Sequence, residues 1–394
     1  MSLNWNQTRI PLTHTIDGRA IELNKFELVG EKDGPQLYLQ SGVHGAELQG
    51  HLVIQELINQ LPDLLNRGRV TCIPCANPMG LNHKIGEFTA GRYHPVSREN
   101  WNRNYLELAS TDTKDIWNWE SILPHMEQDN WVELFRNYCI QVLKQKLDSE
   151  RNKYSLSLAK KLAWTLQLEA LKADLMLDLH TGPQSTRYIY TADFAALKSI
   201  DLGFDYSIVI PPEFGGAMDE ACFMPWVHLR DKLSQKNLDM EIPVESYTLE
   251  LGNEEKVCTA SAINDLAGIF HFMMKRGMIE KQAYEQWVES VPFLQPNEDR
   301  FAHSQAGKLD EFISYRAPES GLVEYLVNPG CHVEAGQAIF EIHRPTQCLN
   351  RKARIIEARQ SGVVINICQS SAVTEGMRLI DILQNTYQLE PNKD

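Results

Sequence analysis

Residues 37–47 read Leu-Tyr-Leu-Gln-Ser-Gly-Val-His-Gly-Ala-Glu, an apolar stretch that runs into a glycine-containing turn. The apolar start predicts a buried strand, and the apolar spacing of residues 48–61 predicts a helix directly after the turn. His44 and Glu47 are therefore expected on the first turn of that helix or in the loop before it. Strands that alternate with helices in this way predict an α/β sheet with helices on both faces.

A second short apolar stretch, residues 173–180, predicts a strand that carries His180 at its carboxyl end. In open α/β sheets, ligand sites collect outside the carboxyl ends of the strands. Two histidines and one carboxylate are the ligand set of many catalytic zinc sites, where a fourth position stays open for water. We therefore expect His44, Glu47 and His180 to bind one zinc ion. Asp178 faces the same side as His180 and could hydrogen-bond a ligand histidine.

A metal-dependent hydrolase also needs a group that carries a proton. Residues 244–250 alternate apolar and polar side chains, which predicts a strand that ends near Glu250. Glu250 is therefore the candidate general base and acid. Glu254 and Glu255 follow in a predicted solvated turn. We assign no function to Tyr247.

Composition narrows the class of protein. The chain has 394 residues, of which 43% are hydrophobic and 23% charged, typical of a soluble protein with two domains or one domain and an appendage. No apolar run approaches the roughly 20 residues of a membrane helix. Residues 1–7 lack a signal-peptide pattern, so the expected location is cytoplasmic. The sequence is compatible with a monomer and with a homo-oligomer.

Charge and cysteine content exclude further classes. The net charge of −14 opposes binding to nucleic acid or anionic membranes, so an anionic substrate must be held by local arginines. Eight cysteines are too sparse for a disulfide framework, which agrees with a reducing compartment. Cys72 and Cys75 have C-x-x-C spacing, but they lie in a predicted buried strand without a second pair.

The pattern of predicted elements changes along the chain. Residues 113–171 are charged and helical in spacing, which predicts a helical insertion beside the site. Residues 264–278 predict a further helix. Strands are expected within residues 70–76, 187–190, 206–210 and 244–250.

The last eighty or so residues contain an internal repeat. The pattern of residues 320–342 recurs in residues 361–382, roughly forty positions later. Two similar β units suggest a small barrel or sandwich with pseudo-twofold symmetry, which resembles the biotinyl and lipoyl carrier fold. Lys352 is the lysine between the two halves, but its neighbours do not form a carrier motif. We therefore expect a structural or substrate-gating cap, joined to the rest through residues 292–314.

The order of the candidate residues resembles that of the zinc carboxypeptidase superfamily, and most closely its succinylglutamate desuccinylase/aspartoacylase branch. The residues that carry this resemblance are His44, Glu47, Asn102, Arg103, His180 and Glu250. The resemblance covers nearly the whole chain. It implies a mixed sheet flanked by helices in a catalytic domain over residues 1–295. It also implies a small C-terminal all-β barrel-sandwich domain over residues 315–394.

A motif of the branch strengthens the resemblance. Several members carry Arg-x-Ser-Pro-x-Asp-x-x-Asn-Leu-Asn-Arg, and residues 92–103 of this chain follow the same register. The matching positions are Arg92, Pro95, Asn100, Asn102 and Arg103. The departures are His94, Ser97 and Trp101, where the pattern has Ser, Asp and Leu. The departures leave the arginines in place and the exact substrate open.

The resemblance implies a role for each matching residue. The zinc ligands would be His44, Glu47 and His180. Glu250 would act as general base and acid. Arg92 would polarise the scissile carbonyl and stabilise its oxyanion, because a guanidinium stays charged and donates in a fixed fork.

The same resemblance implies a clamp for the substrate. Asn102 and Arg103 would hold a substrate carboxylate, with Arg103 giving bidentate hydrogen bonds. Arg98 in the same loop is more simply a solvated charge. Arg187 is a weaker candidate for a second substrate contact, and a plain strand-edge arginine explains it as well.

These observations lead to one main expectation and two alternatives. The main expectation is a zinc-dependent hydrolase, with one Zn²⁺ per chain, that cleaves the amide bond of an N-acyl amino acid or a related small amide. Cobalt or manganese would be other possible metals. A metallocarboxypeptidase would use the same residues on peptide C-termini. A non-catalytic carrier or binding protein would instead use the C-terminal β domain.

Overall fold

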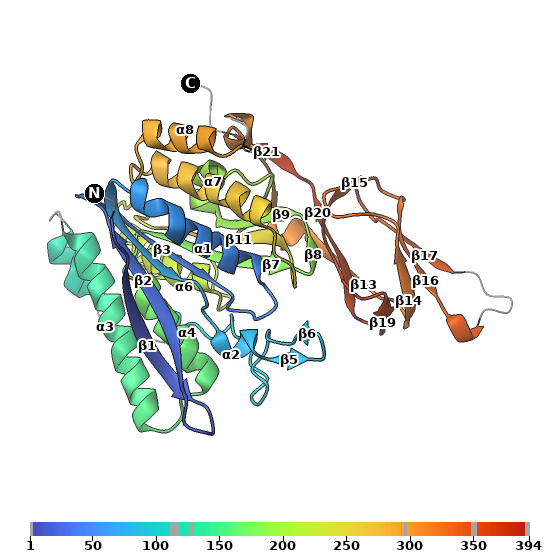
Figure 1. The fold of residues 1–394 in the computed structure, drawn as a ribbon, viewed down its shortest axis with the longest axis horizontal. Coiled ribbons are helices and arrows are strands. Elements are labelled where there is room, and N and C mark those ends of the chain that lie inside the picture. Colours follow the sequence, from blue (N-terminus) through green and yellow to red (C-terminus); the bar gives the residue numbers. More distant parts are fainter. Residues whose placement is uncertain are drawn as a thin grey trace. The chain divides into compact units, whose positions relative to one another are not determined.

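The computed structural model (Figure 1) describes residues 3–110, 119–126, 130–292, 294, 298–347 and 353–390. The chain folds into two compact units. The first unit comprises Met1–His180, Pro212–Thr248 and Val257–Pro296. The second unit comprises Thr181–Pro211, Leu249–Lys256 and Asn297–Asp394.

The first unit is built on a mixed sheet with the strand order β1-β2-β4-β3-β7-β11. The strand β3 runs parallel to β4 and β7, whereas β2 pairs antiparallel with β1 and β4. The expected α/β architecture is confirmed. The strands are β1 (Asn6–His14), β2 (Ala20–Val29), β3 (Lys32–Ser41), β4 (Arg67–Ile73), β7 (Leu175–Gly182) and β11 (Glu245–Asn253), and a small hairpin adds β5 (Lys84–Ile85) and β6 (Phe88–Thr89).

Helices cover both faces of this sheet. The helices α1 and α7 lie side by side on one face, while α4 and α6 pack together on the other (Figure 1). Gly50 of α1 lies against Ser41 and Leu179 of the sheet, so the alternate strand positions point to the α4 and α6 side. The helices are α1 (Gln49–Gln60), α2 (Pro78–Leu81), α3 (Trp131–Asn152), α4 (Leu158–Ala170), α6 (Met218–Ser234), α7 (Thr259–Lys275) and α8 (Lys281–Ser290).

Two helix predictions can be compared with the structure. The helical stretch predicted over residues 113–171 contains α3 and α4, and residues 111–118 and 127–129 lie outside the described part. The helix predicted over residues 264–278 is α7, which begins five residues earlier, at Thr259. None of the helices in the described ranges has the length and apolar character that a membrane crossing needs.

The second unit joins a run of four mixed strands to a β sandwich. The run has the order β9-β10-β12-β21, with β10 parallel to both β9 and β12 and with β21 antiparallel to β12. Its elements are β9 (Arg187–Ala192), α5 (Ala196–Ser199), β10 (Tyr206–Ile210), β12 (Ser304–Lys308) and β21 (Tyr387–Leu389). The sandwich consists of the sheets β13-β20-β18-β15 and β17-β16-β14-β19, and β8 also pairs with β18. Their strands are β8 (Gln184–Ser185), β13 (Phe312–Arg316), β14 (Gly321–Tyr325), β15 (His332–Val333), β16 (Ala338–His343), β17 (Arg354–Glu357), β18 (Gly362–Ile367), β19 (Ala372–Val373) and β20 (Arg378–Gln384).

The sequence repeat is visible in the pairing of the sandwich strands. In each repeat the first and third strands pair with each other, as β14 with β16 and β18 with β20. The short middle strand crosses to the other repeat, so that β19 pairs with β14 and β15 pairs with β18. Apolar residues from both repeats, including Val323, Phe340, Val364 and Ile380, form one core. The predicted barrel-sandwich is confirmed, while Lys352 lies outside the described residues.

Candidate metal centre

The turn after β3 positions two of the three predicted ligands. β3 ends at Ser41 and α1 begins at Gln49, so His44 and Glu47 lie in the loop before the helix. The turn needs glycine at Gly45, because a Cβ there would come within 2.1 Å of the Gly80 carbonyl oxygen. This close backbone approach fixes the loop that carries His44 and Glu47.

The third predicted ligand comes from the neighbouring parallel strand. β7 pairs with β3 in parallel register, so the carboxyl ends of the two strands lie at the same edge of the sheet. His180 lies near this end of β7. Its Nδ1 atom is 2.6 Å from Oε2 of Glu47, and Nδ1 of His44 is 2.8 Å from Oε1 of the same carboxylate.

The structure thus brings together His44, Glu47 and His180, which we call the buried triad. Their potential ligand atoms all lie within 4.8 Å of one another, and the residues are only 3%, 2% and 3% exposed. Three such groups in one buried place could hold a metal ion.

Each imidazole of the triad is also held on its outer nitrogen. Nε2 of His180 donates to Oδ2 of Asp178 over 2.9 Å, which is the hydrogen bond expected from the strand alternation. Nε2 of His44 lies 2.9 Å from Oδ1 of Asn100. A carboxylate or amide oxygen on the outer nitrogen orients a ligand imidazole and leaves its inner nitrogen for the metal.

The hydrogen bonds of Asn100 fix the tautomer of His44. Oδ1 of Asn100 also accepts from the backbone N–H of Asn102 over 2.9 Å, so this atom must be the amide oxygen. Nε2 of His44 is therefore the donor, and Nδ1 presents its lone pair towards Glu47. The sequence analysis matched Asn100 to the family motif but gave it no role. The signal available in the sequence for Asn100 was that it and Asn102 are polar residues on either side of Trp101, which is buried.

Burial and charge act in opposite directions on the three triad residues. Burial lowers the pKa of His44, which favours the neutral imidazole. Burial alone would raise the pKa of Glu47, but the imidazoles of His44 and His180, when protonated, outweigh it and hold that pKa well below its usual range. Burial also opposes a charge on His180, but Asp178 and Glu47 together raise its pKa well above the usual value. Among the triad residues, His180 is therefore the imidazole whose surroundings favour the protonated form.

The donor set fits a bound cation. The lone pair on Nδ1 of His44 faces the carboxylate oxygen of Glu47 at 2.8 Å, and two acceptors at that distance repel each other. A cation between them would satisfy both. Neutral imidazole nitrogen and carboxylate oxygen are the ligands that zinc takes at catalytic sites. The residues present therefore fit the metal that the sequence predicts.

Arg92 lies beside the triad. Its Nη1 atom donates to Oε1 of Glu47 over 3.1 Å and is 3.5 Å from Nδ1 of His44. The side chain is 47% exposed, so the guanidinium has one side on the triad and another towards solvent. This placement suits a group that meets a substrate at the metal.

The two predicted clamp residues follow in the same loop. Asn102 is buried at 4% exposure, and its Nδ2 atom is 3.4 Å from Nε2 of His180. Arg103 is exposed, and its Nη1 atom donates to the backbone carbonyl of Asn102 over 2.7 Å. Asn102 therefore contacts a triad histidine, while Arg103 faces solvent. Their roles in substrate binding stay predictions.

The remaining predicted residues belong to the second unit, which contains the end of β11 from Leu249 onwards. Glu250 lies on β11. Burial is the largest cause that raises the pKa values of Tyr188 and Tyr190, and the charge of Glu250 is the second largest. Arg187 begins β9 and places its guanidinium 4.8 Å from the centre of the Phe204 ring. The roles of Glu250 and Arg187 also stay predictions.

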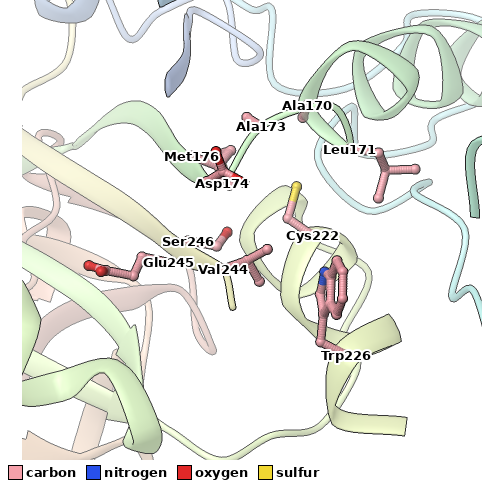
Figure 2. A pocket seen from close by; sticks show the side chains of 10 residues that line it. All are labelled: Ala170, Leu171, Ala173, Asp174, Met176, Cys222, Trp226, Val244, Glu245 and Ser246. Atoms are coloured by element: carbon pink, nitrogen blue, oxygen red, sulfur yellow. The ribbon is translucent and has the colours of Figure 1, made fainter. Parts of the chain in front are cut away.

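A small cavity lies where β7 and β11 begin, whereas His180 lies near the other end of β7. Figure 2 shows the side chains that line this cavity. Asp174 and Glu245 line it where these strands begin, together with Cys222 and Trp226 of α6. Its volume of about 10 Å³ is enough for about one water molecule. This cavity is too small to be a substrate pocket.

Comparison with known proteins places these observations in a family. The family model described as the succinylglutamate desuccinylase/aspartoacylase catalytic domain matches residues 33–276, more than half of the chain. No curated relative matches the chain.

Solved structures resemble the whole chain. A protein from Shewanella frigidimarina NCIMB 400, provisionally named succinylglutamate desuccinylase/aspartoacylase, is 29% identical, with all of both chains covered and a TM-score of 0.88. A provisionally named family protein from Shewanella amazonensis SB2B is also 29% identical, with 98% of this chain and 100% of that chain covered and a TM-score of 0.87. The ectoine utilization protein EutE (DoeB) from Ruegeria pomeroyi, solved with product bound, shares the fold at 16% identity. The coverage is 98% and 95%, with a TM-score of 0.63.

Proposed function

The chain belongs to the succinylglutamate desuccinylase/aspartoacylase family, and we propose that it is a zinc-dependent deacylase. Its substrate would be an N-acyl amino acid or a related small amide, cleaved at the amide bond by water. The observation that carries this proposal is the buried triad, in which two imidazoles turn their Nδ1 atoms towards one carboxylate.

The metal would be held by Nδ1 of His44, the carboxylate of Glu47 and Nδ1 of His180. A bound zinc ion supplies Lewis acidity, which lowers the pKa of a water and polarises a carbonyl. Asn100 and Asp178 keep the two Nδ1 atoms directed inwards through their hydrogen bonds to Nε2. The protein part of the site is thus oriented before metal or substrate arrives.

Arg92 would act on the substrate carbonyl. Its guanidinium contacts Glu47 and remains half exposed, so it can donate to an oxygen that gains negative charge during attack. Arginine keeps its charge at any physiological pH, which makes this donor independent of protonation.

Glu250 stays the proposed general base and acid on the strength of the family resemblance. A carboxylate in this role takes a proton from the attacking water and passes it to the leaving nitrogen. Asn102 and Arg103 are proposed to bind the substrate carboxylate, as the matching motif implies. Arg103 supports this role by its exposure, because a charged donor at the surface can meet an anionic group.

The test combines metal content with a substrate panel. The purified protein should contain close to one zinc per chain by elemental analysis, and it should hydrolyse at least one of a set of acetyl, succinyl and aspartyl amino acids. Short peptides with a free C-terminus serve as the comparison. Faster cleavage of their C-terminal peptide bond than of the N-acyl amino acids would make the protein a metallocarboxypeptidase. A protein that binds no divalent metal and cleaves neither class would overturn the proposal.

A further inference from the structure

Gln40 is a fully buried polar residue that has no part in the proposed chemistry. It lies on β3 with 0% of its surface exposed, directly opposite Asp178 in the parallel ladder with β7. Leu37 and Leu39 on the same strand are apolar core residues. A primary amide at such a position costs free energy unless its polar atoms are hydrogen-bonded.

The amide of Gln40 links a tyrosine to the carboxylate behind His180. Oη of Tyr38 donates to Oε1 of Gln40 over 2.9 Å, and Nε2 of Gln40 donates to Oδ1 of Asp178 over 3.0 Å. An ionised carboxylate only accepts hydrogen bonds, so the nitrogen of the amide must face Asp178. The hydrogen bonds to Tyr38 and Asp178 therefore determine the orientation of the Gln40 side chain.

Asp178 is held on both of its oxygens by this arrangement. Oδ1 accepts from Gln40, and Oδ2 accepts from Nε2 of His180 over 2.9 Å. Asp178 is itself 0% exposed, so bulk water cannot replace a lost donor. Without the Gln40 donor, the carboxylate would keep an unsatisfied buried oxygen or rotate to satisfy it at the expense of His180.

We propose that Gln40 is a positioning residue for the metal centre, which fixes the Asp178 carboxylate and through it the direction of Nδ1 of His180. This inference rests on the proposed function, because it assigns Gln40 a role in metal binding. Tyr38 is also 0% exposed, so the chain of hydrogen bonds ends inside the protein. It therefore orients His180 and offers no route for a proton to solvent.

The principal test measures the zinc affinity of the Gln40→Met protein with a competing chelator. Methionine keeps the length and volume of the side chain but removes the donor and the acceptor. We expect the affinity to fall by roughly 10- to 100-fold, the typical effect of losing a partner behind a metal ligand. Tyr38→Phe is the matched control, because it removes the other hydrogen bond of Gln40 and leaves the donor to Asp178. Its zinc affinity should fall much less.

A double-mutant cycle shows whether Gln40 acts through Asp178. In an Asp178→Leu background, which removes the acceptor of the Gln40 hydrogen bond, the further change Gln40→Met should alter zinc affinity by less than twofold, whereas independent effects would multiply. Thermal unfolding of the metal-free proteins checks that each variant folds. Should Gln40→Met fail to fold, Gln40→Asn keeps the amide but is one methylene too short to reach Asp178, and the same drop is expected.

The outcomes separate this inference from the proposed function. A wild-type protein that binds no zinc would overturn both. Wild-type zinc binding with an unchanged affinity in Gln40→Met would overturn the inference alone. Multiplying effects of Gln40→Met and Asp178→Leu would also overturn it, because Gln40 would then not act through Asp178.

Discussion

The molecule contains two groups of histidine and glutamate side chains that look alike by proximity alone. Among the described residues, each group has potential ligand atoms within 4.8 Å of one another. One group is the buried triad of the first unit. The other, which we call the surface cluster, lies on β14 and β16 of the second unit and consists of Glu324, Glu341 and His343.

The two groups differ in what surrounds them. In the triad, the imidazole nitrogens lie 2.6 and 2.8 Å from one carboxylate, and a second polar partner holds the outer nitrogen of each ring. In the surface cluster, Nε2 of His343 is 3.4 Å from Glu324 and 3.9 Å from Glu341, and its side chain is 43% exposed. Water screens such exposed groups and leaves their side chains mobile. Burial and outer hydrogen bonds, more than proximity, therefore distinguish the candidate metal site from the surface cluster.

The largest expected effect comes from removing the carboxylate of the triad. Glu47→Gln should lose bound zinc and all measurable amide hydrolysis, because a neutral amide oxygen is a poor zinc ligand. The matched control is Glu341→Gln in the surface cluster, which should keep the zinc content and activity of the wild type. Elemental analysis and a hydrolysis assay check both. Loss of the metal from Glu341→Gln, together with its retention in Glu47→Gln, would contradict the assignment of the metal to the triad.

A second prediction separates metal binding from proton transfer. Glu250→Gln should keep about one zinc per chain but lose kcat by roughly 10²- to 10⁴-fold, the usual contribution of a general base. KM should change little if Glu250 acts only in the chemical step. Steady-state kinetics on zinc-loaded protein measures both constants. Near-normal turnover of this variant would refute the assignment of Glu250.

A third prediction addresses the outer hydrogen bonds that distinguish the two groups. Asn100→Leu removes the acceptor that fixes the tautomer of His44, so zinc affinity should fall by about 10- to 100-fold. Ser97→Ala, in the exposed part of the same loop, controls for a general change of the loop. Chelator competition measures both affinities. Equal affinities of Asn100→Leu and the wild type would show that Asn100 does not orient the ligand.

The smallest expected effect is on thermal stability. Ligand that binds only the folded state stabilises it, by about 2.7 kcal/mol when the free ligand is at one hundred times Kd. Added zinc should therefore raise the unfolding temperature of the wild type by some degrees, as scanning calorimetry would show. His343→Ala should show the same rise. A rise that disappears in His343→Ala would assign the stabilising metal to the surface cluster instead.

The sequence predicted the triad because strand ends and glycine turns place particular residues at one edge of a parallel sheet. The repeat in the last fifth of the chain likewise predicted the barrel-sandwich, since equal patterns fold into equal β units. Strand alternation also predicted that Asp178 faces the same side as His180. These features depend on local periodicity, which a single sequence displays.

Other features depend on contacts between distant segments and were not predictable in this way. Asn100 and His44 are far apart in the chain, and nothing local indicates that one orients the other. Gln40 reads as an ordinary strand residue until its register opposite Asp178 is known. The exchange of β15 and β19 between the two repeats also follows from tertiary pairing. The start of α7 at Thr259, five residues before the predicted start, shows that periodicity alone does not determine where a helix begins.

The central claim is that one zinc ion is bound by inward-facing Nδ1 atoms of two histidines and by the carboxylate between them. Anomalous diffraction at the zinc edge, on crystals of the zinc-loaded protein, tests it most directly. We predict one strong peak among Nδ1 of His44, Glu47 and Nδ1 of His180, with both Nε2 atoms still hydrogen-bonded to Asn100 and Asp178. A peak elsewhere, such as the surface cluster, or coordination through Nε2, would contradict the account.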